Sequence, residues 1–323
     1  MKIVVIGGGT GTFPVLSGLK KYVPSVTAIV TMADSGGHSG YLADELGILP
    51  PGDIRNSLVA LADESKRQVL RQLLAHRIDY KSGHTENIGN LMLVALDKIF
   101  NDFEKSIDFL GELLQAKGKV IPVTLDKTCL NAKTVDGKTI NGEKNIDIPK
   151  TVNRPAIEKV WLKPIPQANP RAKKAILEAE AIVIGPGDIF TSIIPNLLVK
   201  GIKEAIKKSK SKKIYITNLM TKNGETDEYQ CSHLVEQIEK YLGEKVLDAV
   251  IINNKKVPSA LVKKYKKEHA KPILFDQENF QKVTYDVYPA SLLTTKAGLI
   301  RHDSERLARQ ILSIVLKLNG NNH

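Results

Sequence analysis

KIVVIGGGTGTFPVLSGLKKY, residues 2–22, combines three signals that predict the start of an open α/β sheet. KIVVI (2–6) is a continuous apolar and β-branched run, which is typical of a strand buried on both faces. GGGTGT (7–12) follows directly, and FPVLSGLKKY (13–22) has helical spacing with Pro14 close to the helix start. The segment therefore predicts a strand, a glycine-rich loop and a helix.

The glycine-rich loop between this strand and this helix is a candidate phosphate site. Backbone amides that glycine leaves accessible suit an anion, as does the positive end of the following helix. Gly7, Gly9 and Thr12 fill the G-x-G-x-x-G dinucleotide frame only in part, and the GK[ST] signature of a phosphate loop does not occur. A plain strand-to-helix turn is the alternative. The candidate nucleotide-binding residues of this loop are Gly8, Gly9, Thr10, Gly11 and Thr12.

Strand-like and helix-like segments alternate along the rest of the chain. AIVIGPGDIFTSIIPNLLVKGIKEAI (181–206) repeats the opening order of strand, glycine loop and helix. Other buried strands are expected at TAIVT (27–31), KIYITN (213–218), DAVIIN (248–253) and PILF (272–275). Helices are expected at about 54–63, 66–76, 87–100 and 106–117. Such alternation predicts an α/β fold with a mostly parallel sheet that is covered on both faces.

Neither a linker nor a tandem repeat divides the sequence, so one domain is expected over residues 1–323. A small β insertion is expected at about 119–165, and it begins with the strand-like run KVIPVTL (119–125). It includes a hairpin in AKTVDGKTI (132–140), where Asp136-Gly137 is a favoured tight-turn pair.

A polar, glycine-rich stretch follows the second expected strand: MADSGGHSGYLADELGILPPGDIRN, residues 32–56. Asp34 comes directly after that strand, where open α/β sheets bind ligands, and it could receive a ribose hydroxyl or help to hold magnesium. Asp53 has a strong structural alternative as the N-cap of the helix at 54–63. The candidate ligand-binding residues are Asp34, Gly36, Gly37, Asp53 and Asn56, with Asp34 also the candidate metal ligand.

Two further polar stretches complete the candidate site. SGHTENIGN (82–90) places His84 and Asn90 ahead of an apolar helix. His84 could act as an acid, a base or a metal ligand, with ordinary capping and loop hydrogen bonding as the alternative. GPGDIFTSIIPN (185–196) forms a second glycine loop at the end of a central strand, and we expect it to face the first loop across a cleft. Its candidate nucleotide-binding residues are Gly185, Pro186, Gly187 and Thr191.

The composition places the chain among globular proteins. With 42% hydrophobic and 25% charged residues, it can bury a large core. Cys129 and Cys231 lie far apart and neither belongs to a CxxC pair, which indicates a reducing cytosol and argues against structural zinc. Since no apolar run approaches the roughly 18 residues that span a bilayer, we expect a cytoplasmic protein without membrane contact.

The net charge of +12 comes mainly from lysine-rich runs such as KKSKSKK (207–213) and KKYKKEHAK (263–271). Few aromatic residues interleave with these lysines, and no nucleic-acid-binding motif occurs, so a solvated lysine face is favoured over a nucleic-acid surface. A basic balance also suits a phosphorylated small ligand.

Several stretches together resemble the gluconeogenesis factor family, which is related to 2-phospho-L-lactate transferase. These stretches are, in order, GGGTGT (7–12), the D-x-G-G-x-S-G frame around Asp34, ILPPGDIRNSLVALAD (48–63), IPVTL (121–125), ANPRAKKAI (168–176), IVIGPGDIFTSIIPNLLVKGI (182–202), TNLMTKNGET (217–226) and GLIRHD (298–303). The resemblance runs nearly end to end. It implies a Rossmann-like three-layer sandwich.

The resemblance also implies a nucleotide-linked ligand. In the gluconeogenesis-factor branch this is a UDP-sugar such as UDP-N-acetylglucosamine, and in the transferase branch it is a GDP-type donor. Asn218, Tyr265 and Arg301 stand at matching motif positions. Tyr265 is thereby a candidate contact for uracil or ribose, with packing of a helix on the sheet as the alternative. Arg301 is a candidate contact for the diphosphate, because guanidinium can engage phosphate through two parallel bonds.

The chain departs from the family pattern at three places. Members usually show two successive aspartates where this chain has Asp34-Ser35, and a serine where it has His38. The usual short G-H-x-x-G-N loop is longer here, as GHTENIGN (83–90), which puts the placement of His84 in doubt. Loss of one carboxylate weakens a magnesium-dependent phosphoryl-transfer site.

We therefore expect a non-catalytic nucleotide-sugar-binding regulatory protein that supports cell-wall precursor synthesis, cell shape and growth on gluconeogenic carbon sources. The alternative is a magnesium-dependent transferase that moves a phosphate-linked group from a nucleotide donor. Magnesium enters as a cofactor through that alternative. A protein partner in cell-wall precursor synthesis and a homo-oligomer are the macromolecular partners that fit this expectation.

Overall fold

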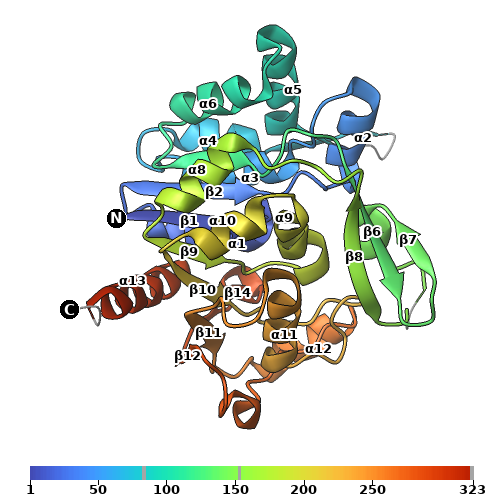
Figure 1. The fold of residues 1–323 in the computed structure, drawn as a ribbon. Helices are drawn as coiled ribbons and strands as arrows, with labels where there is room; N and C mark the ends of the chain where they lie inside the picture. The colour runs from blue at the N-terminus through green and yellow to red at the C-terminus, as the bar shows by residue number, and fades with distance from the viewer. Residues whose placement is uncertain (82–84, 152–153, 321–323) are drawn as a thin grey trace.

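Seven parallel strands form one central sheet (Figure 1). The structure is a computed structural model, and it describes residues 1–81, 85–151 and 154–320. Across the sheet the strands are, in order, β12 (Asp286–Ala290), β11 (Ala249–Asn253), β10 (Lys212–Ile216), β9 (Ala181–Ile184), β1 (Lys2–Gly7), β2 (Ser25–Val30) and β5 (Lys119–Pro122).

The path of the chain through this sheet changes direction at β1. From β1 the chain adds β2 and then β5 on one side, and later it adds β9, β10, β11 and β12 on the other side. This is the strand order of doubly wound nucleotide-binding sheets, and it leaves a topological switch point between β1 and β9. The expected Rossmann-like α/β fold with a parallel sheet is therefore confirmed.

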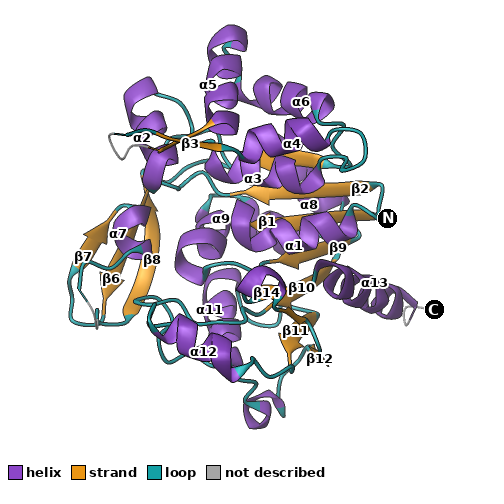
Figure 2. Cartoon of the chain, turned by 180° about the vertical axis from the view of Figure 1, so that it is seen from behind, coloured by secondary structure: helices purple, strands orange, loops and turns teal. Residues whose placement is uncertain are grey.

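Successive residues of β1 point to opposite faces of the sheet, as the pleat of a strand requires. Ile3 and Val5 pack into one hydrophobic core, and Val4 and Ile6 pack into the other. The first core lies beneath α1 (Gly9–Leu19), α3 (Gly52–Leu61), α6 (Phe103–Leu113) and α13 (Ser304–Gly320) (Figure 2). The second lies beneath α8 (Pro170–Glu178), α9 (Ile194–Leu198), α10 (Ile202–Lys208) and α11 (Cys231–Leu242).

Local capping residues decide where two of the expected helices begin. Asn87 accepts a hydrogen bond from the Asn90 amide at 3.0 Å, so α5 (Ile88–Phe100) starts close to its expected position. Asp102 accepts from the Lys105 amide at 3.0 Å, so α6 starts three residues before its expected position at 106. The helix expected at about 66–76 is α4 (Gln68–Ala75).

The small β insertion is present, but it begins later than expected. The strand at 119–122 is β5 of the central sheet, paired with β2, because its apolar side chains are buried between the two helical layers. The insertion proper consists of β6 (Cys129–Thr134), β7 (Thr139–Asn141), α7 (Glu143–Asp147) and β8 (Ile157–Lys163). Its hairpin turns at the expected place, where Gly137 has a φ of +88°.

The seventh strand of the sheet is not the one expected from the sequence. PILF (272–275) makes only an isolated bridge between Pro272 and Met220, whereas DVYPA (286–290) pairs with β11. The strand DVYPA has only half-buried and exposed residues because it lies at the edge of the sheet, and it therefore lacks the apolar run that marks the central strands.

The remaining elements lie outside the central sheet. They are α2 (Gly37–Leu46), β3 (Arg77–Asp79), β4 (Thr85–Asn87), α12 (Ser259–Lys266), β13 (Leu293–Thr294) and β14 (Arg301–His302).

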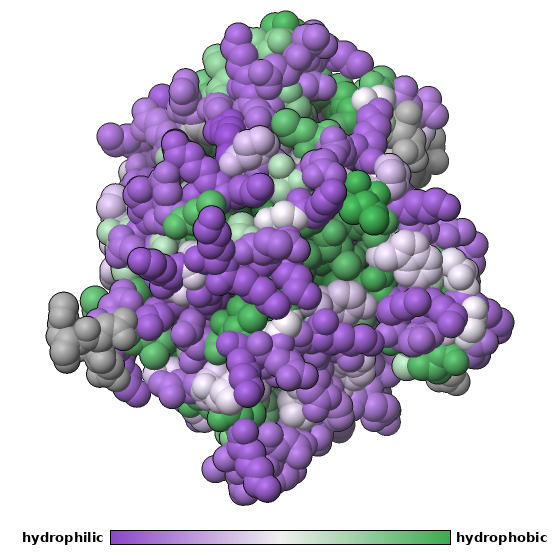
Figure 3. Space-filling model, in the orientation of Figure 1, coloured by the Kyte–Doolittle hydropathy of each residue, from purple (hydrophilic) through white to green (hydrophobic). Residues whose placement is uncertain are grey.

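Hydrophilic side chains cover most of the face seen in Figure 3, with smaller apolar areas between them. The lysine-rich run at 207–213 is not one uniform surface. Lys207, Lys208 and Lys210 are exposed, but Lys213 is half-buried and donates to the Ser209 carbonyl as β10 begins. Among the described residues, no helix is both long enough and apolar enough to cross a membrane.

Candidate functional site

A cavity with a volume of about 710 Å³ lies at the switch point of the sheet. β1 and β9 pair side by side, and each ends in one of the two glycine loops. The cavity therefore has the position at which open α/β sheets bind ligands, outside the carboxyl ends of the strands. It is lined by Thr10, Gly11, Pro14, residues 147–149, 186–188, Ser192, residues 218–223, Tyr265, Glu268, Ala270 and residues 300–302.

The first glycine loop is a tight junction between β1 and α1. A Cβ added at Gly9 would lie 2.7 Å from Cβ of Asn56, so this glycine lets α1 pack closely on α3. Thr12 is buried, and its hydroxyl donates to the Gly8 carbonyl at 2.6 Å. Thr10 and Gly11 line the cavity, so the positive end of α1 faces it. Of the five residues expected from this loop, Gly8, Gly9 and Thr12 therefore serve the packing of the junction.

The second glycine loop touches the first. A Cβ added at Gly11 would lie 2.5 Å from Cα of Gly187, and closer still to the carbonyl oxygen of Pro186. The expectation that the two loops face one another across a cleft is therefore wrong: they are in contact, and the cavity lies beside both. Asn218 supports this arrangement, because its side-chain oxygen accepts from the Gly187 amide at 3.1 Å.

Thr191 and Gly185 of the second loop do not line the cavity. Gly185 adopts a φ of +76° where the chain turns out of β9, a conformation that glycine adopts without a steric penalty. Thr191 is buried, and its hydroxyl donates to Glu225 at 3.0 Å. The neighbouring Ser192 lines the cavity instead.

Asp53 does not cap its own helix. α3 begins at Gly52 after Pro51 without a side-chain cap, and Asp53 lies in its first turn. A backbone hydrogen bond from Gly9 reaches the Asp53 carboxyl, so this side chain caps α1, the neighbouring helix. Burial, and then the nearby Asp34 carboxylate, raise the pKa of Asp53 to about 7. The N-cap expectation is therefore wrong about which helix receives the cap.

Asp34 is tied to the β insertion. Its Oδ1 accepts from the Gly36 amide at 2.8 Å, and its carboxyl shares a hydrogen bond with Glu143 of α7. Burial raises the pKa of Asp34, and burial followed by the charge of Asp34 raises the pKa of Glu143 to about 8. The pair therefore holds a proton between its two carboxyls near neutral pH. The Ser35 amide donates to Glu143 at 3.3 Å, and the Lys144 amide donates to the Ser35 hydroxyl at 3.2 Å.

These contacts mean that Asp34 and Gly36 hold α7 of the insertion against the loop after β2. Gly37 opens α2 next to them. Neither Asp34 nor Gly36 is among the residues that line the cavity. Their expected role in ligand binding stays a prediction.

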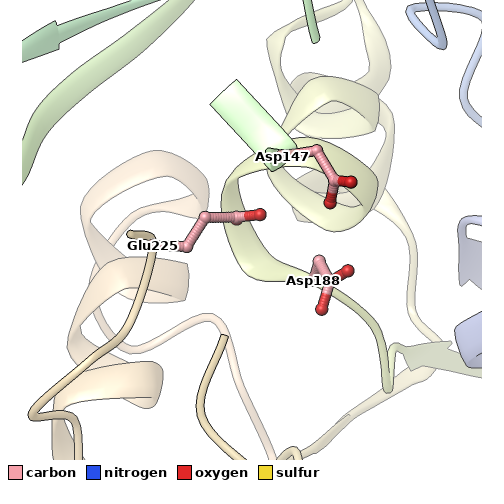
Figure 4. A group of neighbouring side chains, drawn as sticks. All are labelled: Asp147, Asp188 and Glu225. Carbon is pink, nitrogen blue, oxygen red and sulfur yellow. The ribbon is translucent and has the colours of Figure 1, made fainter. Parts of the chain in front are cut away.

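Three carboxylates that the sequence analysis did not single out converge beside the cavity (Figure 4). Asp147 ends α7, Asp188 follows the second glycine loop, and Glu225 lies in the turn after β10. Each offers one oxygen within 4.8 Å of the others. Such a set of hard oxygen donors is of the kind that Mg²⁺ prefers.

Neighbouring groups already form ion pairs or hydrogen bonds with all three carboxylates. Lys222 Nζ lies 2.8 Å from Asp147 and 3.7 Å from Asp188. Burial acts to lower the pKa of Lys222, but the charges of Asp188 and Asp147 raise it overall, so the lysine stays charged. Glu225 accepts from the Phe190 amide at 3.1 Å as well as from Thr191. The residues present fit Mg²⁺ in donor type, but a cation would compete with Lys222 for Asp147 and Asp188.

Arg301 and Tyr265 both line the cavity. Arg301 is exposed on β14, lines the cavity, and lies close enough to Asp188 to lower its pKa, although burial of Asp188 outweighs this effect. The Tyr265 hydroxyl accepts from the Ile300 amide at 3.1 Å, which fixes the backbone next to Arg301. Tyr265 packs in a small apolar cluster with Leu219 and Ile300, apart from the two cores of the central sheet, and it lines the cavity as well. Its expected contact with a ligand stays a prediction.

The remaining expected residues lie around this centre. Asn56 lies outside the cavity lining and donates to the Thr10 hydroxyl at 3.2 Å. Asn90 is buried in the first turn of α5 and does not line the cavity. His84 lies outside the described residues. Pro186, Gly187, Asn218, Tyr265 and Arg301 are, together with Thr10 and Gly11, the expected residues that the structure gathers around the cavity.

Asp188 and Lys222 each had a local signal in the sequence. Asp188 directly follows the second glycine loop, and Lys222 stands in the polar run TKNGET (221–226). Asp147 had none, because it belongs to a short helix in the insertion whose position over the cavity depends on tertiary contacts.

Comparison with known proteins gives consistent matches over nearly the whole chain. Residues 3–293 match the family described as 2-phospho-L-lactate transferase CofD. A protein of Thermoanaerobacterium thermosulfurigenes named "Putative gluconeogenesis factor" is 41% identical over 317 residues, which are 97% of each chain. The gluconeogenesis factor of Bacillus subtilis is 38% identical over 97% of this chain and 98% of its own. The crystal structure of a UPF0052 family member from Bacillus halodurans superposes with a TM-score of 0.90 at 36% identity, covering 96% of this chain and 98% of that chain.

Proposed function

This chain belongs to the 2-phospho-L-lactate transferase CofD family, and we propose that it is a nucleotide-sugar-binding regulatory protein whose ligand occupies the cavity at the switch point. The ligand we propose is a UDP-sugar of the UDP-N-acetylglucosamine type. The observation that carries the proposal is the meeting of the α1 N-terminus, the second glycine loop and Arg301 around one cavity. Together they offer partial and full positive charge to a diphosphate.

The rest of the cavity wall suits the other parts of such a ligand. Its volume of about 710 Å³ falls in the range of roughly 300–1,000 Å³ that is typical of small-molecule sites. Leu219, Met220, Ala270 and Ile300 supply apolar surface for a flat base, with Tyr265 beside them. Asn218, Ser192 and Thr221 supply hydrogen-bonding groups for hydroxyls.

A binding role is favoured over a catalytic one by the state of the carboxylates. Lys222 bridges Asp147 and Asp188, both oxygens of Glu225 accept hydrogen bonds, and Asp34 shares a proton with Glu143. A magnesium-dependent transferase needs ionised carboxylates that are free to coordinate the metal. We therefore propose that the ligand acts as a signal. In this role the protein would support cell-wall precursor synthesis, cell shape and growth on gluconeogenic carbon sources. The names of its relatives, gluconeogenesis factors, support only the last of these.

The test of this proposal is mass spectrometry of the small molecules released when the purified protein is denatured. We expect a UDP-sugar in an amount that approaches one molecule per chain. The same preparation of an Arg301→Ala variant should release much less, because the diphosphate loses its charged partner. Release of an unrelated ligand class, or of nothing from protein that also fails to take up added UDP-sugar, would contradict the proposal.

The second candidate function is a transferase that uses the same cavity. It is favoured by one observation, the convergence of Asp147, Asp188 and Glu225 within 4.8 Å of one another. If a cation displaced Lys222, these residues would hold Mg²⁺, which would neutralise the phosphates of a nucleotide donor. Turnover of a nucleotide donor that requires Mg²⁺ and is lost in Asp188→Asn would establish this function. Turnover that is equally fast in excess chelator would exclude the metal-assisted route.

A further inference from the structure

Arg55 is the least accessible arginine side chain next to the site, with 7% of the residue exposed. Within the part of the chain that the structure describes, no carboxylate lies within salt-bridge distance of its guanidinium. Nη2 donates to Asn56 Oδ1 at 2.8 Å, Nη1 approaches the Leu74 carbonyl at 3.4 Å, and Nε has no partner. Burial, and then the charge of Arg77, lower the pKa of Arg55 to about 10, and the charge of Asp53 offsets this only in part. Burying such a charge is costly, so the few hydrogen bonds that this side chain makes need an explanation.

The bond from Arg55 fixes the orientation of the Asn56 amide. Arginine has five N–H donors and no acceptor, so the Asn56 atom that it contacts must be the oxygen. The amide nitrogen is then the atom that faces Thr10, and it donates to Thr10 Oγ1 at 3.2 Å. An asparagine alone could present either atom to Thr10. Arg55 removes that freedom.

The orientation of Asn56 in turn decides what the Thr10 hydroxyl can do. Because Oγ1 already accepts from Asn56, its own proton must point elsewhere. Thr10 lies in the first turn of α1 and lines the cavity. A hydroxyl proton directed to the cavity at a helix N-terminus is suited to an anionic oxygen.

We propose that Arg55 is a positioning residue, which acts through Asn56 to present the Thr10 hydroxyl as a hydrogen-bond donor to a phosphate oxygen of the bound ligand. This inference rests on the proposed nucleotide function. It adds that Thr10 is the donor, and the ligand phosphate the acceptor, in one hydrogen bond of that site. Arg55, Asn56 and Thr10 form a relay in which each bond fixes the direction of the next. Arg55 and Asn56 themselves do not touch the ligand.

Arg55 also has a structural role that any test must separate from the relay. Its Nη1 faces the last turn of α4 at Leu74, and its stem packs where a Cβ of Gly89 would lie. Loss of the arginine would therefore disturb α4 and α5 as well as Asn56. The informative substitutions are thus at Asn56 and Thr10. Asn56→Asp keeps an acceptor for Arg55 but has no donor, so it forces the Thr10 hydroxyl to donate to the carboxylate and turns it away from the ligand.

The experiment is a double-mutant cycle with UDP as the probe, measured by calorimetry on wild type, Thr10→Val, Asn56→Asp and the double variant. We expect Thr10→Val to weaken UDP binding by about tenfold to a hundredfold, as for loss of one hydrogen bond to a charged acceptor. Asn56→Asp should weaken it by a similar factor in wild type and by less than about threefold in Thr10→Val. Thr10→Ser keeps the hydroxyl and should recover most of the affinity that Thr10→Val loses.

Two controls separate the relay from other effects. Asn101→Asp makes the same chemical change at the C-terminus of α5, at a residue outside the cavity lining, and should leave UDP affinity unchanged. Thermal unfolding checks that each variant is folded. If Asn56→Asp does not fold, Arg55→Met takes its place in the cycle, since it releases the Asn56 amide and should also lose its effect in the Thr10→Val background.

The outcomes are distinct. If Asn56→Asp weakens UDP binding equally with and without the Thr10 hydroxyl, its added charge acts directly on the phosphate and the relay is wrong. If Thr10→Val binds UDP as wild type does, Thr10 gives no bond to phosphate and the inference fails, while the nucleotide function stands. If the wild-type protein binds no UDP or UDP-sugar, the proposed function itself fails.

Discussion

Gly11 of the first glycine loop and Gly187 of the second are so close that a Cβ on Gly11 would lie 2.5 Å from Cα of Gly187. The loops that end β1 and β9 therefore form one wall of the cavity, and they hold each other in place. No side chain can be added at Gly11 unless the loops separate. This contact explains why position 11 holds a glycine.

We expect Gly11→Ala to lower the free energy of unfolding by about 1–3 kcal/mol, the usual cost of overpacking, and to weaken ligand binding because the wall moves. The matched control is Gly111→Ala in α6. There the added methyl meets only Leu58 at 3.6 Å, and alanine in a helix is more favourable than glycine by roughly 0.5–1 kcal/mol. Urea unfolding measures the free energy of unfolding of both variants, which should fall for Gly11→Ala and not for Gly111→Ala. Equal stabilities for Gly11→Ala and wild type would show that the loops can separate without cost.

Arg301→Ala should weaken UDP-sugar binding by about tenfold to a hundredfold, because a charged hydrogen bond is worth roughly 1.5–3 kcal/mol. Arg301→Lys should recover only part of this, since lysine keeps the charge but loses the planar fork. Arg309→Ala is the control, because Arg309 is exposed on α13 and pairs with Glu305 away from the cavity. Calorimetry with a folded Arg301→Ala variant that binds normally would place the diphosphate elsewhere.

Tyr265→Phe should lower the free energy of unfolding by about 1–3 kcal/mol, because the buried Ile300 amide loses its acceptor. Ligand affinity should fall less than in Arg301→Ala, since the phenyl ring still lines the cavity and only the backbone beside Arg301 is loosened. Tyr288→Phe is the matched control: its hydroxyl bonds to Asp286 at an exposed position, where the loss should stay below about 0.5 kcal/mol. A Tyr265→Phe variant as stable as wild type would mean that the Ile300 amide finds another acceptor.

The raised pKa values of Glu143 and Asp53 predict a pH dependence of stability. In the folded protein these carboxyls have pKa values of about 8 and about 7, burial being the main cause of each, and they hold protons that the unfolded chain has released. The free energy of unfolding should therefore fall as the pH rises toward 8. His302 has the opposite sign, because burial lowers its pKa from 6.5 to about 4, so its contribution rises with pH and is complete above about 6.5.

The informative window is thus pH 6.5 to 8, and the informative variant is Glu143→Gln. Glutamine cannot ionise, but it keeps an oxygen for the Ser35 amide and a donor for Asp34. Urea unfolding across this window should show a shallower decline for Glu143→Gln than for wild type. Glu112→Gln, at an exposed position on α6, should follow the wild-type slope. If the slopes of wild type and Glu143→Gln coincide, Glu143 does not hold its proton in this range.

The central fold could be predicted from the sequence because its signals are local. KIVVI, TAIVT and AIVI are continuous apolar runs, each followed by glycine or polar residues and then by a helical pattern, so a parallel sheet covered on both faces follows from them. β12 could not be predicted in this way, because an edge strand with half-buried and exposed residues lacks that apolar run. KVIPVTL was assigned to the insertion because an apolar run shows that a strand exists but not which sheet it joins.

The site was predictable only where its residues stand beside a glycine loop or in a recognisable motif. Thr10, Gly11, Pro186, Gly187, Asn218, Tyr265 and Arg301 were found in this way. Asp53 was expected to cap the helix that contains it, but its carboxyl reaches Gly9 of α1, which is a tertiary contact. Asp147 and Glu225 were not found, because the position of each near Asp188 depends on the docking of a distant segment.

The central claim is that the cavity at the switch point binds a nucleotide diphosphate with specificity. The most direct measurement is a calorimetric titration of the wild-type protein with UDP-N-acetylglucosamine in moderate salt, repeated in the presence of excess inorganic polyphosphate and of adenine nucleotides. We predict one binding site per chain, with an affinity that neither competitor reduces substantially. If no binding is detected, or if polyphosphate displaces the UDP-sugar and binds more tightly than every nucleotide, the cavity is a nonspecific anion site and the account is wrong.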